Sequence, residues 1–140
     1  METAALTALF VGALTVWREA RNQTDEGKLA VAYTLVERAS RPGWWNKGRV
    51  GSVVAVATMP WQYSSITDPS DPQLRYFPGE SDAQWDACVT AMRQALAGAQ
   101  PNPAPGADSY YAVSMPIPPK WATPQSFVKQ VGDHRFYRIL

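Results

Sequence analysis

The chain has 140 residues, 46% of them hydrophobic, which is typical of one globular domain around a single core. Thirteen basic and twelve acidic residues leave a net charge of +1, so the overall charge indicates neither a nucleic acid nor an anionic membrane as partner. A single cysteine excludes an intramolecular disulfide. One cysteine and one histidine are too few ligands for a conventional zinc site. We therefore expect a single domain, residues 1–140, that is monomeric and uses no metal or other cofactor.

The first predicted element is a helix in the apolar run from Ala4 to Trp17. The run is shorter than the roughly 20 residues that a membrane-spanning helix needs. No basic segment precedes it, as a secretory signal peptide would require. Large apolar residues recur at steps of three and four, which is typical of a helix packed in a core. We expect a buried helix that ends near Glu19, and no stable membrane insertion.

Two further helices are predicted before residue 60. Thr24 is a suitable N-cap for the first, with Asp25 and Glu26 in its favourable first turn. Its apolar stripe ends before the segment Arg41–Trp45. The second lies in Val50–Thr58, where the β-branched residues would also suit a strand, although we favour a helix.

A long irregular connection follows, because the prolines and the Ser and Asp residues between Met59 and Pro72 favour turns. The fourth helix is the best marked: Ser81 and Gln84 form a capping-box pattern, and an apolar stripe runs to Gly98 as the stop. The remaining segment carries seven of the twelve prolines, so we expect loops and a short hairpin there. The predicted fold class is mainly α (α+β), with long loops.

These loops are rich in aromatic and polar side chains. Long loops inside a compact domain are usually functional or disordered, and these are too aromatic to be disordered. Aromatic faces stack on pyranose rings while amides and hydroxyls bind their substituents, so we predict a groove for a saccharide. Packing in the core would explain the same aromatic residues. The expected lining residues are Gln62, Tyr63, Ser64, Tyr110, Tyr111, Trp121, Phe136 and Tyr137.

The segment VWREARNQTDEG places Glu19 at the end of the first apolar helix, between Arg18 and Arg21. A partly desolvated carboxyl group there would have a raised pKa and would donate a proton near neutral pH. Cleavage of a glycosidic bond requires such a donor. A salt bridge to either arginine would instead lower the pKa and give Glu19 a structural role. From spacing alone the salt bridge is the more common arrangement, and both interpretations stay open.

Five blocks of the sequence carry a resemblance to a known family: VWREARNQTDEGKLAVAYTLVERA (Val16–Ala39), PWQYSSI (Pro60–Ile66), GADSYY (Gly106–Tyr111), PPKWA (Pro118–Ala122) and GDHRFYRI (Gly132–Ile139). In this order they resemble the cell-wall hydrolase family typified by the spore-cortex-lytic enzyme SleB.

The first block keeps the family's Glu-Ala-Arg signature at residues 19–21 and replaces its second glutamate by Gln23. The form with Arg18 is similar to the branch found in bacteriophage lysis proteins. In the second block, Tyr63 replaces the family's phenylalanine.

The resemblance implies a lysozyme-like or lytic transglycosylase-like, mainly helical fold that acts on the glycan strands of peptidoglycan. It implies that Glu19 occupies the position of the catalytic acid. It also implies that Gln62, Ser64, Tyr111 and His134 lie around the cleft, in substrate binding or positioning.

The reaction type depends on how many carboxylates take part. A hydrolase generally needs a second one, and Asp25, Glu26, Asp68 and Asp71 are the candidates. The first two fit as first-turn helix charges and the last two precede prolines in a turn-rich loop. A lytic transglycosylase needs only one glutamate, as acid and then base, and forms a 1,6-anhydro product. We favour it for Glu19, with muramidase hydrolysis helped by Asp68 or Asp71 as the alternative.

A protein that acts on the cell wall could also be an amidase or a binding module. A zinc amidase would need more histidines than His134 alone. A non-catalytic wall-binding module would use the same aromatic residues but would not depend on Glu19.

The expected route to the wall follows from the lack of a signal-peptide pattern. We expect a phage endolysin that is made in the host cytoplasm, reaches the periplasmic cell wall through a holin-type pore, and lyses the host cell. A secreted enzyme with its signal removed would have the same sequence.

Overall fold

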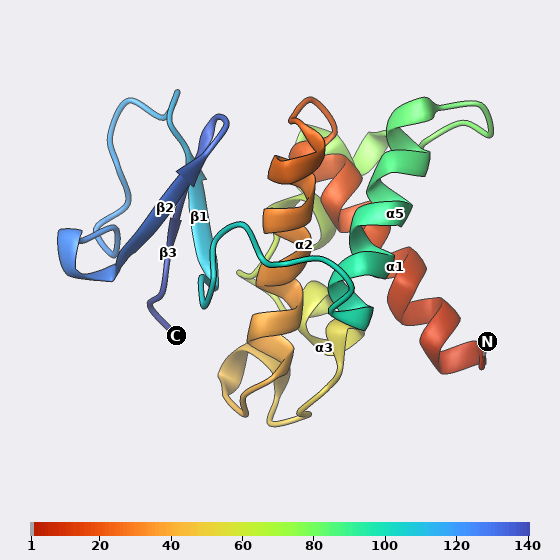
Figure 1. The fold of residues 1–140 in the computed structure, drawn as a ribbon, viewed down its shortest axis with the longest axis horizontal. Coiled ribbons are helices and arrows are strands. Elements are labelled where there is room, and N and C mark those ends of the chain that lie inside the picture. The colour runs from red at the N-terminus through yellow and green to blue at the C-terminus, as the bar shows by residue number, and fades with distance from the viewer. Residues whose placement is uncertain (1) are drawn as a thin grey trace.

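The computed structural model describes residues 2–140, which form five α-helices, three 3-10 turns and one three-stranded sheet (Figure 1). The helices are α1 (Thr3–Ala20), α2 (Asp25–Ala39), α3 (Val53–Thr58), α4 (Ser64–Thr67) and α5 (Ala83–Ala97). The strands are β1 (Ser109–Ala112), β2 (Phe127–Val131) and β3 (His134–Tyr137). The 3-10 turns are Trp44–Asn46, Pro72–Arg75 and Pro124–Ser126. The prediction of a mainly α fold with a small β part is confirmed.

The core lies between α1, α2 and α5, which pack against one another, with α3 closing one end. Val16, Leu35 and Met92 are fully buried there. Gly12 of α1 lies directly against Met92 of α5, because a Cβ at residue 12 would come within 2.6 Å of the Met92 sulfur. A side chain at this position would force the two helices apart.

Only part of α1 is buried, which corrects the expectation of a buried helix. Its last two turns, including Val16 and Trp17, are in the core. Its first turns project beyond the other helices, and Leu6 and Phe10 are 40% and 47% exposed (Figure 1). No helix within residues 2–140 has the length and apolarity that a membrane crossing would need.

Helix ends follow the predicted signals with one exception. Thr24 caps α2 by accepting a hydrogen bond from the Gly27 N–H, and Gly98 ends α5 with a left-handed φ of 62°. The predicted Ser81 cap is wrong, because α5 is capped by Asp82, whose carboxylate accepts from the N–H groups of residues 84 and 85. Asp82 also accepts from the Trp17 indole N–H at 3.1 Å, so the cap links α5 to α1.

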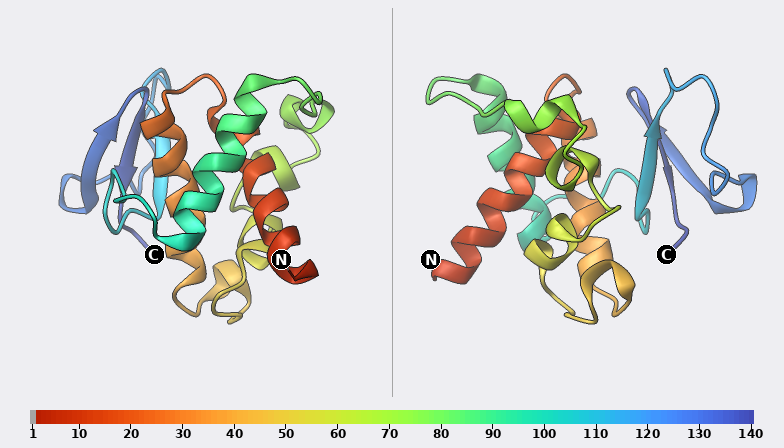
Figure 2. Two further views of the ribbon diagram at one scale, coloured as in Figure 1. Left: turned by 45° about the vertical axis from the view of Figure 1, so that its right-hand side comes forward. Right: turned by 180° about the vertical axis from the view of Figure 1, so that it is seen from behind.

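The C-terminal segment forms more regular structure than the predicted hairpin. β2 and β3 are an antiparallel hairpin, and β1 pairs with the other edge of β3, giving the order β1-β3-β2. The sheet stands beside α2, on the side away from α1 and α5 (Figures 1 and 2). β1 nevertheless reaches the C-terminal end of α1, where the Tyr110 hydroxyl donates a hydrogen bond to Glu19.

Gln23 fastens the β2–β3 turn to the turn between α1 and α2. It is 8% exposed; its Oε1 accepts from the Asp133 N–H at 3.0 Å, and its Nε2 donates to Asp133 Oδ2 at 3.2 Å. Gly132 permits this approach, since a Cβ there would lie 2.7 Å from Gln23 Oε1. The glutamate that the family has at residue 23 could not donate to Asp133.

Replacing Gln23 by Glu is expected to lower the free energy of unfolding by about 1–3 kcal/mol, because a donor is lost and two carboxylates face each other. Urea denaturation at neutral pH measures the change. The double variant Gln23→Glu/Asp133→Asn should recover most of it, because the asparagine amide can donate to the new carboxylate. No recovery in the double variant would contradict this account of the turn.

Candidate active site

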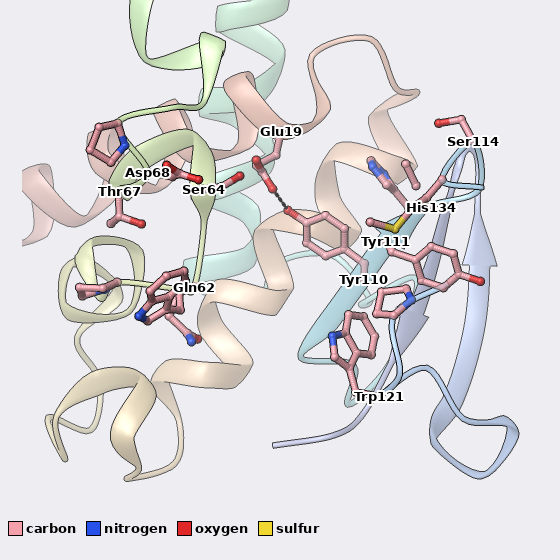
Figure 3. Close-up of a pocket in the computed structure, with 16 residues that line it drawn as sticks. Glu19, Gln62, Ser64, Thr67, Asp68, Tyr110, Tyr111, Ser114, Trp121 and His134 are labelled. Atoms are coloured by element: carbon pink, nitrogen blue, oxygen red, sulfur yellow. Dashed lines mark hydrogen bonds between the residues drawn. The ribbon is translucent and has the colours of Figure 1, made fainter. Parts of the chain in front are cut away.

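A cavity of about 810 Å³ lies between the helical part of the molecule and the sheet (Figure 3). Its helical wall comes from the end of α1 and from the segment after α3, which includes α4. Its other wall comes from β1, the loop that follows it, and β3. The side chains along these walls include Glu19, Gln62, Ser64, Thr67 and Asp68 on the first and Tyr110, Tyr111, Ser114, Trp121 and His134 on the second.

Glu19 lies between the two walls, one residue before the end of α1. Its carboxylate oxygen Oε1 accepts a hydrogen bond of 2.5 Å from the phenolic hydroxyl of Tyr110 in β1 (Figure 3). The apolar run that places the end of α1 in the core also leaves Glu19 only partly exposed at the cavity. The site therefore depends on a contact between residues 91 positions apart.

The two arginines that flank Glu19 in sequence do not pair with it. Arg18 donates to the Ser65 carbonyl at 2.9 Å, and Arg21 donates to Gln73 Oε1 at 2.6 Å. The one ion pair within residues 2–140 lies elsewhere in the molecule. The salt bridge considered from the sequence is therefore absent from the described residues.

Burial raises the pKa of the Glu19 carboxyl above its ordinary value, and the negative charge of Asp71 adds to this effect. The hydroxyls of Tyr110 and Ser65 and the charge of Arg38 act in the opposite direction and lower the pKa, but burial is the larger effect. The result is a carboxyl group that holds its proton at a higher pH than an exposed glutamate does, which suits a proton donor.

Tyr110 is a neutral donor to Glu19. Burial and the nearby negative charge of Glu19 raise the pKa of the Tyr110 hydroxyl well above its ordinary value, so it stays protonated. Its ring packs against His134, with centroids 5.0 Å apart, and against the fully buried Phe136 at 5.5 Å. The sheet therefore fixes the direction from which the hydrogen bond reaches Glu19.

Gln62 presents a fixed amide to the cavity. The buried Arg38 donates from Nη1 to Gln62 Oε1 and from Nε to the Asp108 carbonyl, both at 2.6 Å. The Gln62 amide oxygen thus accepts a hydrogen bond from Arg38. Its NH₂ group has no hydrogen-bond partner within residues 2–140. Ser64, beside it on the same wall, donates to Asp71 Oδ2 at 2.7 Å.

His134 lies in β3 with 7% of its surface exposed, and it lines the cavity. Burial lowers the pKa of its imidazole, against the opposing effect of Asp133, so the ring is neutral near neutral pH. Its Nδ1 is buried and has no hydrogen-bond partner among the described residues.

Three of the residues predicted for the groove, Tyr63, Phe136 and Tyr137, lie outside the cavity. Tyr63 is 2% exposed and shares a hydrogen bond with Thr34, at 2.9 Å between the hydroxyl oxygens, under the guanidinium of Arg38. Tyr137 is 3% exposed and stacks behind Tyr111, with ring centroids 5.8 Å apart. Tyr63 and Phe136 belong to the hydrophobic core. Tyr137 follows Phe136 in β3 and therefore points to the opposite face of the sheet, where Trp121 and Phe127 also pack against it.

Trp61 was missed from the sequence, although it is 91% exposed and lines the cavity next to Gln62. The contact between Tyr110 and Glu19 was missed as well, since no spacing in the sequence brings these two residues together. Residues of the loop after β1, such as Ser114 and Met115, also contribute to the wall. The position of Trp61 directly after a proline in a turn-rich segment was the one available signal.

Cys88 belongs to the core and not to the cavity. It is fully buried in α5, and burial raises the pKa of its thiol to about 12. Across residues 2–140, no group of three or more His, Cys, Asp and Glu side chains is arranged to hold a metal ion.

A family model described as Cell Wall Hydrolase matches residues 22–137. The match spans both walls of the cavity, including Tyr110 and His134, and begins just after Glu19. Comparison with curated proteins and with solved structures gave no match.

The raised pKa of Glu19 predicts how its replacement changes stability with pH. A carboxyl whose pKa is higher in the folded than in the unfolded state stabilises the fold at low pH and loses that contribution as pH rises through the folded pKa. Glu19→Gln should therefore raise the unfolding midpoint at neutral pH, and the gain should disappear on acidification. Thermal denaturation from pH 3 to 8 tests this.

The exposed Glu80 is the matched control, since Glu80→Gln removes a carboxylate of the same type outside the cavity. A stability gain for Glu19→Gln that is equal at all pH values would contradict the raised pKa.

Proposed function

Because the chain belongs to the Cell Wall Hydrolase family, whose substrate class is peptidoglycan, we propose that it cleaves the β-1,4 bond between N-acetylmuramic acid and N-acetylglucosamine. The carrying observation is Glu19: a carboxyl with a raised pKa, lining a large cavity and hydrogen-bonded to a neutral hydroxyl instead of an arginine. Such a group meets the requirements of a general acid for glycosidic cleavage.

In the first step, protonated Glu19 donates its proton to the glycosidic oxygen, and the bond from this oxygen to C1 of the muramic acid breaks. Tyr110 supports the step because its hydrogen bond stabilises the carboxylate that is left behind. Departure of the sugar thus leaves an ionised Glu19 beside a positively charged C1 centre.

In the second step, the ionised Glu19 takes the proton of the C6 hydroxyl of the same muramic acid, and the C6 oxygen bonds to C1. The product is a 1,6-anhydro sugar, and Glu19 regains its proton. This lytic transglycosylase reaction is our preferred version, because it needs no second carboxylate and both nearby acids already accept hydrogen bonds from the protein. Asp71 accepts from Ser64 Oγ and from the Gln73 N–H, and Asp68 accepts from both the N–H and the hydroxyl of Ser70.

Muramidase hydrolysis is the alternative, and one observation favours it. Asp68 lines the same cavity as Glu19, and its hydrogen bonds with Ser70 lower its pKa, so it is an ionised carboxylate facing the proposed substrate. In this version Asp68 either activates a water molecule as a general base or bonds to C1 as a nucleophile.

The lysozyme-like character implied by the resemblance belongs to this proposal. It is supported by a glutamate near the buried C-terminal end of α1, facing a small sheet across a cavity. The proposed phage endolysin role is supported by the similarity of the Arg18 form to bacteriophage lysis proteins. It predicts that producing the protein in bacteria causes lysis only when a holin-type pore is produced with it.

Glu19→Gln is expected to reduce release of soluble fragments from purified peptidoglycan by about 10²–10⁴-fold, because the proton donor is lost. Binding to the insoluble wall and the folded circular dichroism spectrum should be retained. Mass spectrometry of the fragments from the unmutated protein should show muropeptides lighter by one water molecule than ordinary reducing ends.

Asp68→Asn separates the two reactions. It should leave the yield of anhydro products nearly unchanged in a transglycosylase, whereas reducing ends together with a large loss in Asp68→Asn would establish the muramidase. Undiminished lysis by Glu19→Gln would exclude Glu19 as the acid, and no fragments from the unmutated protein would favour a wall-binding module.

A further inference from the structure

A second, smaller cavity of about 300 Å³ adjoins the one that holds Glu19. The two share Trp61, Gln62, Tyr110 and Trp121 in their linings, so they are parts of one continuous cleft. Trp44, from the turn after α2, adds a third indole ring to the smaller cavity. We call this part, between Trp44, Trp61 and Trp121, the tryptophan groove.

Trp61 is unusual in both its exposure and its backbone. Its side chain is 91% exposed, although burial of a tryptophan ring is strongly favourable. Its φ of 73° lies in the left-handed region, which costs a bulky residue about 1–3 kcal/mol. The ring gains little packing to offset this cost. The Trp61 indole therefore remains exposed to solvent at the junction of the two cavities, where a ligand can pack on it.

The floor of the tryptophan groove is polar and fixed. Gln62 is held there by the hydrogen bond from Arg38, and its free NH₂ group is a donor for a hydroxyl or an acetamido oxygen. Flat aromatic walls over a rigid amide suit the apolar face and the polar substituents of an N-acetylated pyranose. A purely apolar ligand would leave the amide unpaired.

We propose that the tryptophan groove is an additional saccharide subsite, in which Trp61 stacks on an N-acetylated sugar of the same glycan strand that passes Glu19. This inference rests on the proposed function, because a continuous cleft delivers the next sugar of a strand cleaved at Glu19 into the groove. The groove lengthens the stretch of strand that the protein recognises, and Trp61 makes longer strands the better ligands.

The test measures binding of N-acetylglucosamine oligomers of two to six units by calorimetry, using Glu19→Gln protein so that no oligomer is cleaved. In this background Trp61→Gly should weaken binding of the longest oligomers about tenfold, in the range for loss of a tryptophan at the centre of a binding site. Binding of the shortest oligomers should be unchanged. Trp61→Tyr, which keeps an aromatic ring, should keep most of the affinity.

The unfolding midpoint distinguishes a binding role of Trp61 from a structural one. If Trp61 stabilised the fold, its replacement would lower the midpoint. Trp61→Gly relieves the left-handed backbone, so its unfolding midpoint should rise while its affinity falls. Phe10→Ala is the control, because Phe10 is a partly exposed ring on α1 that lines neither cavity. It should bind every oligomer like the parent protein.

Equal binding by the parent protein and Trp61→Gly for every oligomer, including no binding by either, would overturn the subsite. A fall in affinity accompanied by a lower unfolding midpoint would do the same. The proposed function fails separately: if Glu19→Gln still digests peptidoglycan while Trp61→Gly loses affinity, the cleft binds saccharide and Glu19 is not its acid.

Discussion

The hydrogen bond between Tyr110 and Glu19 connects the two parts of this molecule at the point where they enclose the cavity. On the helical side, burial in the core fixes the end of α1. On the sheet side, Tyr110 is held by Phe136 and His134 behind its ring. The hydrogen bond forms only when both α1 and the sheet are held in place. The environment of the Glu19 carboxyl therefore depends on the position of the sheet relative to the helices.

The arginines around Glu19 show how a carboxyl keeps a raised pKa among positive charges. Arg18 and Arg21 are satisfied by the Ser65 carbonyl and the Gln73 amide, and Arg38 by Gln62 and a main-chain carbonyl. Each of the three guanidinium groups donates hydrogen bonds to neutral acceptors, which do not compensate its positive charge. Arg38 still lowers the pKa of Glu19, but burial outweighs its effect. The negative charge of Asp71 acts on both Arg18 and Glu19, so charges of both signs surround the carboxyl.

Sequence patterns predicted α1, α2, α3 and α5 because each of these helices is decided locally. The expectation of an irregular connection between Met59 and Pro72 is wrong at Ser64–Thr67, where the short helix α4 forms. The Thr24 cap, the apolar stripe of α2 and the left-handed stop at Gly98 are all written within a few residues. The site was predictable only in part, because it is made by contacts between distant segments. The sequence could place Gln62 and Trp121 on irregular segments. It could not decide that Tyr63 turns into the core, that Tyr137 packs among aromatic rings on the sheet, or that Trp61 turns outward. β1 was missed because SYYA is too short to be distinguished from a loop without its partner β3.

The order of the segments along the chain has a consequence for how the protein is made. Glu19 belongs to α1, which is synthesised before the strands β1 and β3 that carry Tyr110 and His134. Pairing of β1 with β3 cannot begin until β3 has emerged, and such non-local contacts form late and slowly. A nascent chain therefore carries its carboxyl without the partner that orients it, and the complete cleft appears only when translation has passed the sheet.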